Sequence, residues 1–378
     1  GEKQKLEICK QLYLKNKILF LDEPTSVLTP QEADEVLTLV RNLATSGQLT
    51  ALMITHKFRE VTKFADEVTV LRNGKFAGSG KVAELTPAQM AEMMIGPGKT
   101  IRKAARSEST ATQSGSHLHL TGLHALDETG IAALEDLHLH VHPGEIVGIA
   151  GVSGNGQTEL VEVLAGQRTL QSGEIRVHGE RYKPTRSNIN RHKMYTLPEE
   201  PLRNTCVGQM SVAQNMAFRH FDRKPFALAR LFVNGRAIRR SAQDLIARYR
   251  VKTPATTTPI RDLSGGNVQR AVLARELSGG VEVLVAANPC FGLDFEAAAD
   301  IRAHIMEARN RGAAVLLVSE DLDEVMELSD RIFVMFDGKL VYETPGASAD
   351  IAIIGRHMAG HTEEIAASSL QRASRNDE

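Results

Sequence analysis

Short apolar runs alternate with longer amphipathic stretches along most of the chain. The apolar runs lie at 17–22, 51–56, 144–151, 314–319 and 331–336. Their length and their β-branched residues predict strands. The amphipathic stretches lie at 30–47, 157–166, 267–279 and 296–312, and their apolar positions recur at helical spacing. Strands that alternate with helices predict an α/β protein with a parallel sheet covered by helices on both faces.

Three pairs of segments show that part of the sequence is repeated. GEKQKLEICKQL at 1–12 resembles GNVQRAVLAREL at 266–277, and LFLDEPTSVLTPQEA at 19–33 resembles LVAANPCFGLDFEAA at 284–298. MITHKFREVTKFADEVTVLRNGK at 53–75 resembles LVSEDLDEVMELSDRIFVMFDGK at 317–339. The offsets are 265, 265 and 264 residues, so three separate matches agree on one period. The chain is therefore predicted to contain two copies of one unit.

The two copies are unequal in length, which sets the expected domain organisation. Residues 1–96 form the C-terminal part of a first copy, 117–346 form a complete second copy, and 347–378 form a C-terminal extension. Residues 97–116 are rich in Ser, Thr and charged residues without apolar periodicity, which predicts a linker. Because the first copy opens inside a repeated motif, at Gly1, we expect the sequence to be a fragment of a longer protein.

A glycine-rich segment in the second copy has the spacing of a phosphate-binding loop. Residues 151–158 read GVSGNGQT, which matches G-x-x-x-x-G-K-[ST] except that Gln157 occupies the Lys position. The segment follows a predicted strand and opens a predicted helix, as a phosphate loop requires. On its own the match is compatible with a degraded nucleotide site, a modified one, or a glycine turn.

Composition narrows the possible partners. Forty-five basic and 46 acidic residues give a formal charge of −1, so no overall field attracts the chain to nucleic acid or to an anionic bilayer. The three cysteines are far apart and form no CxxC pair, which argues against a disulfide framework and fits a reducing cytosol. No apolar run reaches the roughly 18 residues needed to cross a bilayer.

Four motifs together carry a family resemblance. LSGGNVQR at 263–270, LFLDEPTS at 19–26, ITHK at 54–57 and FGLD at 291–294 resemble the signature, Walker B, switch-histidine and D-loop motifs of ATP-binding-cassette (ABC) transporter ATPases. The order and the duplication resemble the tandem two-cassette ATPases of simple-sugar and nucleoside importers. The resemblance implies one and a half copies of a P-loop NTPase ABC cassette. Each such cassette is an α/β domain with a mixed sheet between helices, a helical subdomain and an antiparallel β subdomain.

The resemblance also implies that ATP and Mg²⁺ bind between two cassettes, so that two sites form. At the first site Asp22 would hold Mg²⁺ through water, Glu23 would polarise the attacking water, and His56 would contact the γ-phosphate. Phosphoryl transfer needs these groups to neutralise phosphate charge and to aim a water in line. The facing signature residues would be Leu263, Ser264, Gly265, Gly266 and Asn267, and Gly1 would end the signature of the first copy. Alone, Asp22 and Glu23 read as solvated acids and His56 as an ordinary histidine.

The second site has lost several of these groups. Its phosphate loop would contribute Gly151, Ser153, Gly154, Asn155, Gly156, Gln157 and Thr158, with Thr158 as a weak metal ligand. Ala287 stands where Asp22 stands, Asn288 where Glu23 stands, and Glu320 where His56 stands. Losing one ammonium beside a phosphate removes at most ~4 kcal/mol at an effective dielectric constant of about 20. The sequence therefore predicts a degenerate second site. Glu199 occupies the Q-loop position, with a solvated loop acid as the alternative.

These features predict a peripheral ATPase subunit of an importer on the cytoplasmic face of the membrane. A separate membrane permease is the expected partner, an extracytoplasmic substrate-binding protein is an indirect one, and no nucleic acid is expected. The fragment alone is expected to be inactive, because the phosphate loop of the first copy would precede Gly1. Two alternatives are a soluble ABC ATPase acting on ribosomes or DNA, and a non-catalytic scaffold. The short linker and the four altered positions argue against the first alternative, and the start inside a signature motif makes a fragment of an importer subunit a better expectation than the second.

Overall fold

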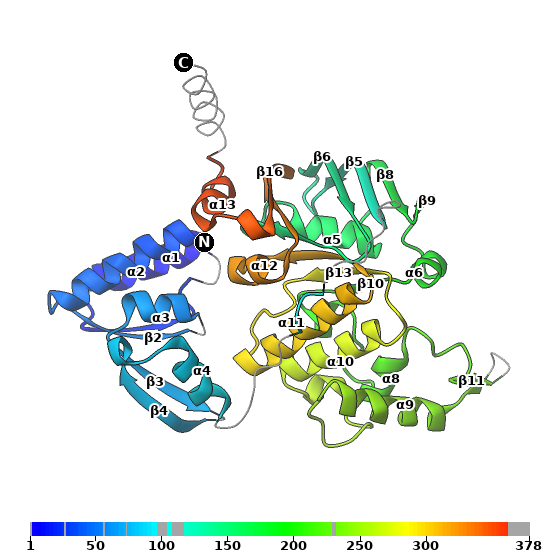
Figure 1. Ribbon diagram of the computed structural model, residues 1–378, viewed down its shortest axis with the longest axis horizontal. Coiled ribbons are helices and arrows are strands. Elements are labelled where there is room, and N and C mark those ends of the chain that lie inside the picture. Colours follow the sequence, from blue (N-terminus) through cyan, green and yellow to red (C-terminus); the bar gives the residue numbers. More distant parts are fainter. Residues whose placement is uncertain are drawn as a thin grey trace, which may run out of the picture. The chain divides into compact units, whose positions relative to one another are not determined.

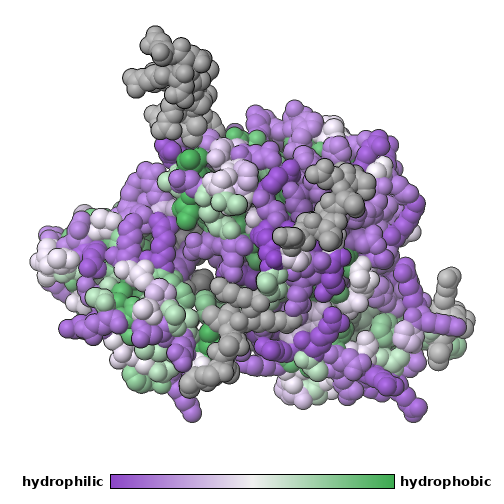
Figure 2. All heavy atoms as spheres, viewed as in Figure 1, coloured by the Kyte–Doolittle hydropathy of each residue, from purple (hydrophilic) through white to green (hydrophobic). Residues whose placement is uncertain are grey.

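The computed structural model describes residues 2–25, 28–55, 57–72, 74–96, 104–107, 117–228 and 232–361. Contacts divide the chain into two compact units (Figure 1). Unit 1 comprises 1–102, 151–153 and 348–378, and unit 2 comprises 103–150 and 154–347. In the described ranges no helix combines the length and the apolar composition that a bilayer crossing requires. Hydrophilic residues predominate on the face shown in Figure 2.

A six-stranded sheet forms the centre of unit 2. Its order is β10-β13-β14-β7-β15-β16, and only the β15–β16 pair is antiparallel. The strands are β7 (Ile146–Ala150), β10 (Met194–Leu197), β13 (Val283–Ala287), β14 (Ala314–Ser319), β15 (Arg331–Phe336) and β16 (Lys339–Pro345). Every residue of β7, β13 and β14 is buried, as expected for strands covered on both faces.

Successive residues of these strands enter two different hydrophobic cores. Val285 and Leu316 pack with the apolar residues of α5, whereas Leu284 and Leu317 pack with α10 and α11. This division follows from the two-residue period of a strand. The helices that pack against the six-stranded sheet are α5 (Gln157–Ala165), α10 (Gly265–Leu277), α11 (Phe295–Asn310) and α12 (Leu322–Leu328).

Two smaller subdomains complete unit 2. An antiparallel sheet of order β6-β5-β8-β9 contains β5 (Leu118–Leu126), β6 (Ala132–Val141), β8 (Ser172–Val177) and β9 (Glu180–Arg181). The helical part contains α6 (Arg186–His192), α7 (Pro201–Asn204), α8 (Val212–Ala217), η2 (Ile260–Asp262), α9 (Gly235–Arg248) and the hairpin of β11 (Ala227–Leu228) with β12 (Phe232–Val233). The mixed sheet, the antiparallel sheet and the helical part match the architecture that the family resemblance predicts.

Part of the predicted linker is anchored to unit 2. Arg106 forms an ion pair with Asp330, and the backbone N–H of Ser107 donates to Asn310 Oδ1 at 3.2 Å. Residues 104–107 therefore pack against the second copy. The other residues of the predicted linker, 97–103 and 108–116, lie outside the described ranges. The low periodicity of this segment gave no signal for the anchor, because it depends on individual polar contacts, which also include Asn310 Nδ2 donating to the carbonyl of Ala105 at 2.9 Å and Arg309 donating to the carbonyl of Ser107 at 2.6 Å.

Unit 1 repeats the order of elements found at the C-terminal end of unit 2. It contains α1 (Glu2–Tyr13), β1 (Ile18–Asp22), α2 (Pro30–Thr45), β2 (Thr50–Ile54), α3 (Phe58–Phe64), β3 (Glu67–Arg72), β4 (Lys75–Lys81), η1 (Val82–Glu84) and α4 (Pro87–Ile95). The sheet of β1 and β2 is parallel, like that of β13 and β14, and the sheet of β3 and β4 is antiparallel, like that of β15 and β16. Thr29 caps α2 in a capping box with Glu32.

One face of the β1–β2 sheet is apolar and exposed. Phe20 is 73% exposed and Leu52 is 50% exposed, whereas their counterparts Val285 and Leu316 are fully buried at 0%. In unit 2 the counterpart face packs against α5, and β7 lies between β14 and β15. Among the described residues of unit 1, no element corresponds to β7 or α5.

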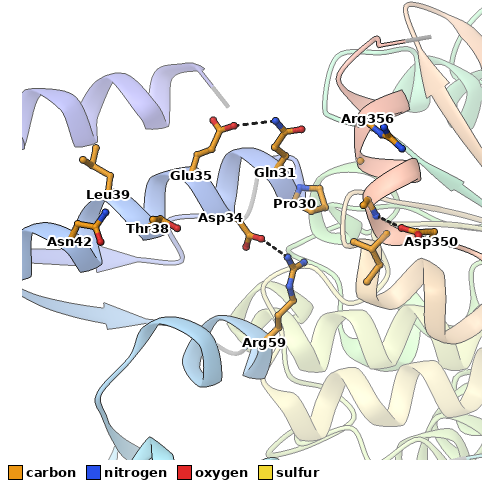
Figure 3. A pocket seen from close by; sticks show the side chains of 13 residues that line it. Pro30, Gln31, Asp34, Glu35, Thr38, Leu39, Asn42, Arg59, Asp350 and Arg356 are labelled. Carbon is orange, nitrogen blue, oxygen red and sulfur yellow. Dashed lines mark hydrogen bonds and ion pairs between the residues drawn. The ribbon is translucent and has the colours of Figure 1, made fainter. Parts of the chain in front are cut away.

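The helix α13 (Ile351–Met358), preceded by η3 (Gly346–Ser348), belongs to unit 1 and packs against α2. A groove of about 1130 Å³ lies between these helices (Figure 3). Arg59 donates to Asp34 at 2.9 Å on one side of it, and Gln31 donates to Glu35 at 3.2 Å. Of the residues that the sequence assigned to the nucleotide sites, none of those that the structure describes lines this groove.

Candidate functional site

Four loops of the second copy meet at one edge of the six-stranded sheet. The register pairs Leu197 of β10 with Ala286, Ala287 with Val318, and Ser319 with Ala150. These strands are parallel, so their carboxyl ends lie at the same edge. The structure therefore brings together the loops that carry Glu199, Asn288, Glu320 and the glycine-rich segment.

The glycine-rich segment forms a closed turn before α5. Gly156 has φ +104°, and an added Cβ would lie 2.4 Å from the carbonyl oxygen of Ala133, so only glycine fits this position. Asn155 ties the turn to the β15–β16 hairpin, because its Oδ1 accepts from the N–H of Asp337 at 2.9 Å and its carbonyl accepts from Gly338 at 3.0 Å.

Gln157 folds back into this turn. Its side-chain oxygen accepts from the backbone N–H of Asn155 at 3.2 Å, and the residue is only 8% exposed. Backbone amides of such a loop are the donors that receive phosphate. The carboxamide therefore occupies a donor that a phosphate oxygen would use. Gly151 and Gly156 are buried, Asn155 is part-buried, and Ser153, Gly154 and Thr158 are exposed.

Asn288 follows β13 at the position that Glu23 occupies after β1. Its Oδ1 accepts from the backbone N–H of Glu320 at 2.8 Å, and its own N–H donates to the carbonyl of Val318 at 2.7 Å. The side chain therefore links two loops of the protein. Ala287, which precedes it, has a methyl side chain and therefore offers a metal no side-chain oxygen at the position where Asp22 carries a carboxylate.

The signature segment lies at the start of α10. Ser264 is the N-cap residue, its side chain forms no capping hydrogen bond, and Ser264 and Gly265 are exposed. Asn267 orders this turn, since its Nδ2 donates to Ser264 Oγ at 2.8 Å and its Oδ1 accepts from the N–H of Lys252 at 2.7 Å. Leu263 and Gly266 are part-buried. The first turn of a 13-residue helix thus presents backbone amides at the surface.

In the first copy, Asp22 ends β1 and is exposed, and the part-buried Glu23 follows it. Glu23 has φ +41°, the same value as Asn288. Its N–H donates to the carbonyl of Ile54 at 2.9 Å, which holds the residue against the end of β2. The two adjacent carboxylates are hard oxygen donors, so this strand end fits Mg²⁺. Gly1 and His56 lie outside the described residues.

Two contacts that the sequence analysis did not identify have counterparts in both copies, and in the first of them the acceptor carbonyl is shifted by one residue. Gln4 Nε2 donates to the carbonyl of Glu23 at 3.1 Å, and Gln269 Nε2 donates to the carbonyl of Pro289 at 3.0 Å. A buried carboxylate, Glu60 in one copy and Glu324 in the other, accepts from the hydroxyl that ends the second strand. The sequence could have revealed these residues, because both copies carry the same residue type at equivalent positions of the repeat.

No group of three or more His, Cys, Asp or Glu side chains suited to a metal occurs among the described residues. Two histidines of β6 make polar contacts within the protein: His138 contacts Asp136 at 3.0 Å and His140 contacts Arg331 at 3.0 Å. Burial, with the positive charge of Arg331, lowers the pKa of His140.

Comparisons with known proteins agree on one family. A sequence profile described as "ABC transporter" matches residues 134–290. A glucose import ATP-binding protein of Haloferax volcanii is 39% identical over 98% of this chain and 67% of its own length. A guanosine import ATP-binding protein of Bacillus subtilis is 36% identical over 97% of this chain and 71% of its own length.

Solved structures show the same fold. A nucleotide-free ATP-binding cassette from an ABC transporter superposes with a TM-score of 0.52 at 20% identity, over 61% of this chain and 92% of that chain. A cassette bound to ADP and Pi superposes with a TM-score of 0.51 at 19% identity, over 60% of this chain and 98% of that chain.

Proposed function

Since the chain belongs to the family of ABC transporter ATP-binding proteins, we propose that it serves an importer of a simple sugar or nucleoside as its ATP-hydrolysing subunit. The names of the relatives support this substrate class, because they include glucose, guanosine and ribose import proteins. A membrane permease is the partner, on the cytoplasmic face of the membrane. An extracytoplasmic binding protein delivers the solute to that permease.

One observation carries the proposal: the two copies hold different residues in the same backbone position. Glu23 and Asn288 share φ +41°, and each donates its N–H to a carbonyl at the end of the neighbouring strand, Ile54 for Glu23 and Val318, one residue before the end, for Asn288. A carboxylate at this position can accept a proton from water, whereas a carboxamide cannot. Hydrolysis therefore occurs with the first-copy residues.

At the first site Asp22 and Glu23 have different roles. Asp22 would hold Mg²⁺, through a water, and the bound ion would supply the positive charge that phosphoryl transfer needs. Glu23 orients the attacking water and takes its proton, and His56 donates to the γ-phosphate. The facing backbone amides come from the signature residues 264–267 at the start of α10, where the helix dipole also favours an anion.

The second site is degenerate. Gln157 brings no positive charge, Ala287 brings no metal ligand, and Glu320 brings a negative charge towards the phosphates. Nucleotide therefore binds there weakly and is not turned over. Glu199, in the loop after β10, transmits closure of the cassettes to the permease.

Paired substitutions in the complete transporter test this assignment. Glu23→Gln should reduce ATPase turnover by at least about 100-fold, because a general base typically contributes 10²–10⁴-fold. Asn288→Asp is the matched control, and it should leave turnover within about twofold of wild type, because Ala287 and Gln157 remain. ATPase rate and solute uptake into proteoliposomes are the measurements. Normal turnover of Glu23→Gln would contradict the assignment of the first site.

A further inference from the structure

The same buried carboxylate appears behind both nucleotide-site edges. Glu60, in α3, is 6% exposed, and Glu324, at the equivalent place in α12, is 1% exposed. Neither was assigned a role from the sequence. Burying a carboxylate is unfavourable unless its oxygens receive hydrogen bonds, so the partners of these residues show what the burial achieves.

In the first copy the two carboxylate oxygens of Glu60 accept hydrogen bonds from two different loops. Oε2 accepts from the hydroxyl of Thr55, directly before His56, at 2.9 Å. Oε1 accepts from the hydroxyl of Thr25, two residues after Glu23, in a short hydrogen bond. Lys57 adds charge, with Nζ 3.8 Å from Oε1 and 3.4 Å from the carbonyl oxygen of Thr25.

The second copy keeps one half of this arrangement. Ser319 Oγ donates to Glu324 Oε2 at 2.8 Å and accepts from the N–H of Asp321 at 3.1 Å. Thr55 does the same in the first copy, accepting from the N–H of Lys57 at 3.1 Å. The loop after the second strand is therefore built alike in both copies.

The other half is chemically changed. Cys290 replaces Thr25, and its thiol contacts the Glu324 carboxylate and also donates to the carbonyl oxygen of Ala298 at 3.5 Å. Arg302 Nε lies 3.5 Å from Glu324 Oε1, whereas the counterpart of Arg302 in α2 is the buried Leu37. Burial raises the pKa of the Glu324 carboxyl, and Arg302 opposes that shift. The carboxylate is thus bonded to the first loop through a hydroxyl in the copy that retains the acidic pair, and through a thiol, which is a weaker donor, in the other copy.

We propose that Glu60 is a positioning residue that fixes the Glu23 loop relative to the His56 loop by binding Thr25 and Thr55 at once. This inference rests on the proposed function of Glu23 and His56. The strand ladder ends at Asp22 and Ile54. Beyond it, the N–H of Glu23 donates to the Ile54 carbonyl at 2.9 Å and Lys57 Nζ contacts the Thr25 carbonyl at 3.4 Å. The Glu60 carboxylate adds a buried constraint to these, with one oxygen bonded to each loop.

The test uses Glu60→Gln in the complete transporter. Gln keeps the size of the side chain but offers only one acceptor oxygen, so one of the two hydroxyls can no longer donate to position 60. We expect kcat to fall about 100-fold, the loss that a misplacement of roughly 1 Å can cause, while KM for ATP stays within about twofold. Glu324→Gln is the matched control, and its kcat should remain within about twofold of wild type.

A second pair keeps the test decisive if Glu60→Gln folds poorly. Thr55→Ser retains the hydroxyl and should keep kcat near wild type, whereas Thr55→Val removes the hydroxyl at similar volume and should lower kcat about as much as Glu60→Gln does. The double variant with Val at position 55 and Gln at position 60 should lose little more than either single variant, because both remove one interaction.

The possible outcomes separate cleanly. If Glu23→Gln abolishes turnover but Glu60→Gln and Thr55→Val turn over normally, the positioning role is wrong and the proposed function stands. Equal losses of kcat in Glu60→Gln and Glu324→Gln, with equal losses of melting temperature, would show that the carboxylate only stabilises the fold. If Glu23→Gln itself remains active, both the proposed function and this inference fail.

Discussion

Replacing Gln157 by Lys tests whether the second glycine-rich loop is a phosphate site weakened by one side chain. The carboxamide of Gln157 is buried and accepts from the N–H of Asn155 at 3.2 Å. A phosphate entering the loop must displace this contact. It also finds no ammonium there. Substitution can separate these two effects, because Ala removes the contact and Lys additionally supplies the charge.

The magnitudes follow from the two interactions. A neutral hydrogen bond contributes about 1 kcal/mol, so Gln157→Ala should tighten ATP binding about fivefold. An ammonium about 4 Å from a phosphate gains at most about 4 kcal/mol at an effective dielectric constant of about 20, or roughly three decades. Because Glu320 remains at the same edge of the sheet and repels phosphate, Gln157→Lys should tighten binding between about tenfold and about a thousandfold.

The assay is a titration of the 378-residue chain with a fluorescent ATP analogue, since the second copy is contained within it. Binding should change little between Mg²⁺ and EDTA, because Ala287 offers no ligand. A Gln157→Lys chain that binds no more tightly than wild type would refute the phosphate cradle. If Gln157→Ala binds more weakly than wild type, the carboxamide helps to hold nucleotide, and the reasoning about displacement is wrong.

Two further predictions concern stability, with urea unfolding as the measurement. Leu316→Ala should lower the free energy of unfolding of unit 2 by about 2–5 kcal/mol, whereas Leu52→Ala, at the exposed counterpart position, should cost less than about 1 kcal/mol; similar losses would contradict the burial difference. Burial lowers the pKa of His117 and of His192 from their ordinary 6.5, so the folded state disfavours their protonation and stability should fall as the pH drops from 7.5 to 5.5. A midpoint that rises on acidification would contradict this sign.

The sequence predicted the central sheet well because its signal is strong and local. The runs at 17–22, 314–319 and 331–336 became β1, β14 and β15, and the helix expected over 296–312 became α11 at Phe295–Asn310. The repeat also placed equivalent residues before any coordinates were known. The order of the strands in the sheet could not be predicted from local patterns, because β7 pairs with β14 and β15, which are far from it in the chain.

The candidate site was only partly accessible to sequence. Motif spacing identified Gln157 and Asn288 as departures, but it did not reveal that each side chain bonds a neighbouring backbone amide. Those contacts depend on rotamers and on loop geometry. Glu60 was overlooked because its importance lies in joining two loops, and a search for phosphate and metal ligands does not select such a residue.

The shared φ of +41° at Glu23 and Asn288 bears on how the two copies diverged. Side chains other than Gly, Asn and Asp occupy left-handed backbone conformations at a conformational penalty of about 1–3 kcal/mol. The first copy tolerates that penalty at Glu23, whereas asparagine at the second copy largely avoids it. If the second copy does not hydrolyse ATP, as proposed, nothing requires a carboxylate at position 288, and asparagine at this φ makes the loop locally more stable than glutamate would.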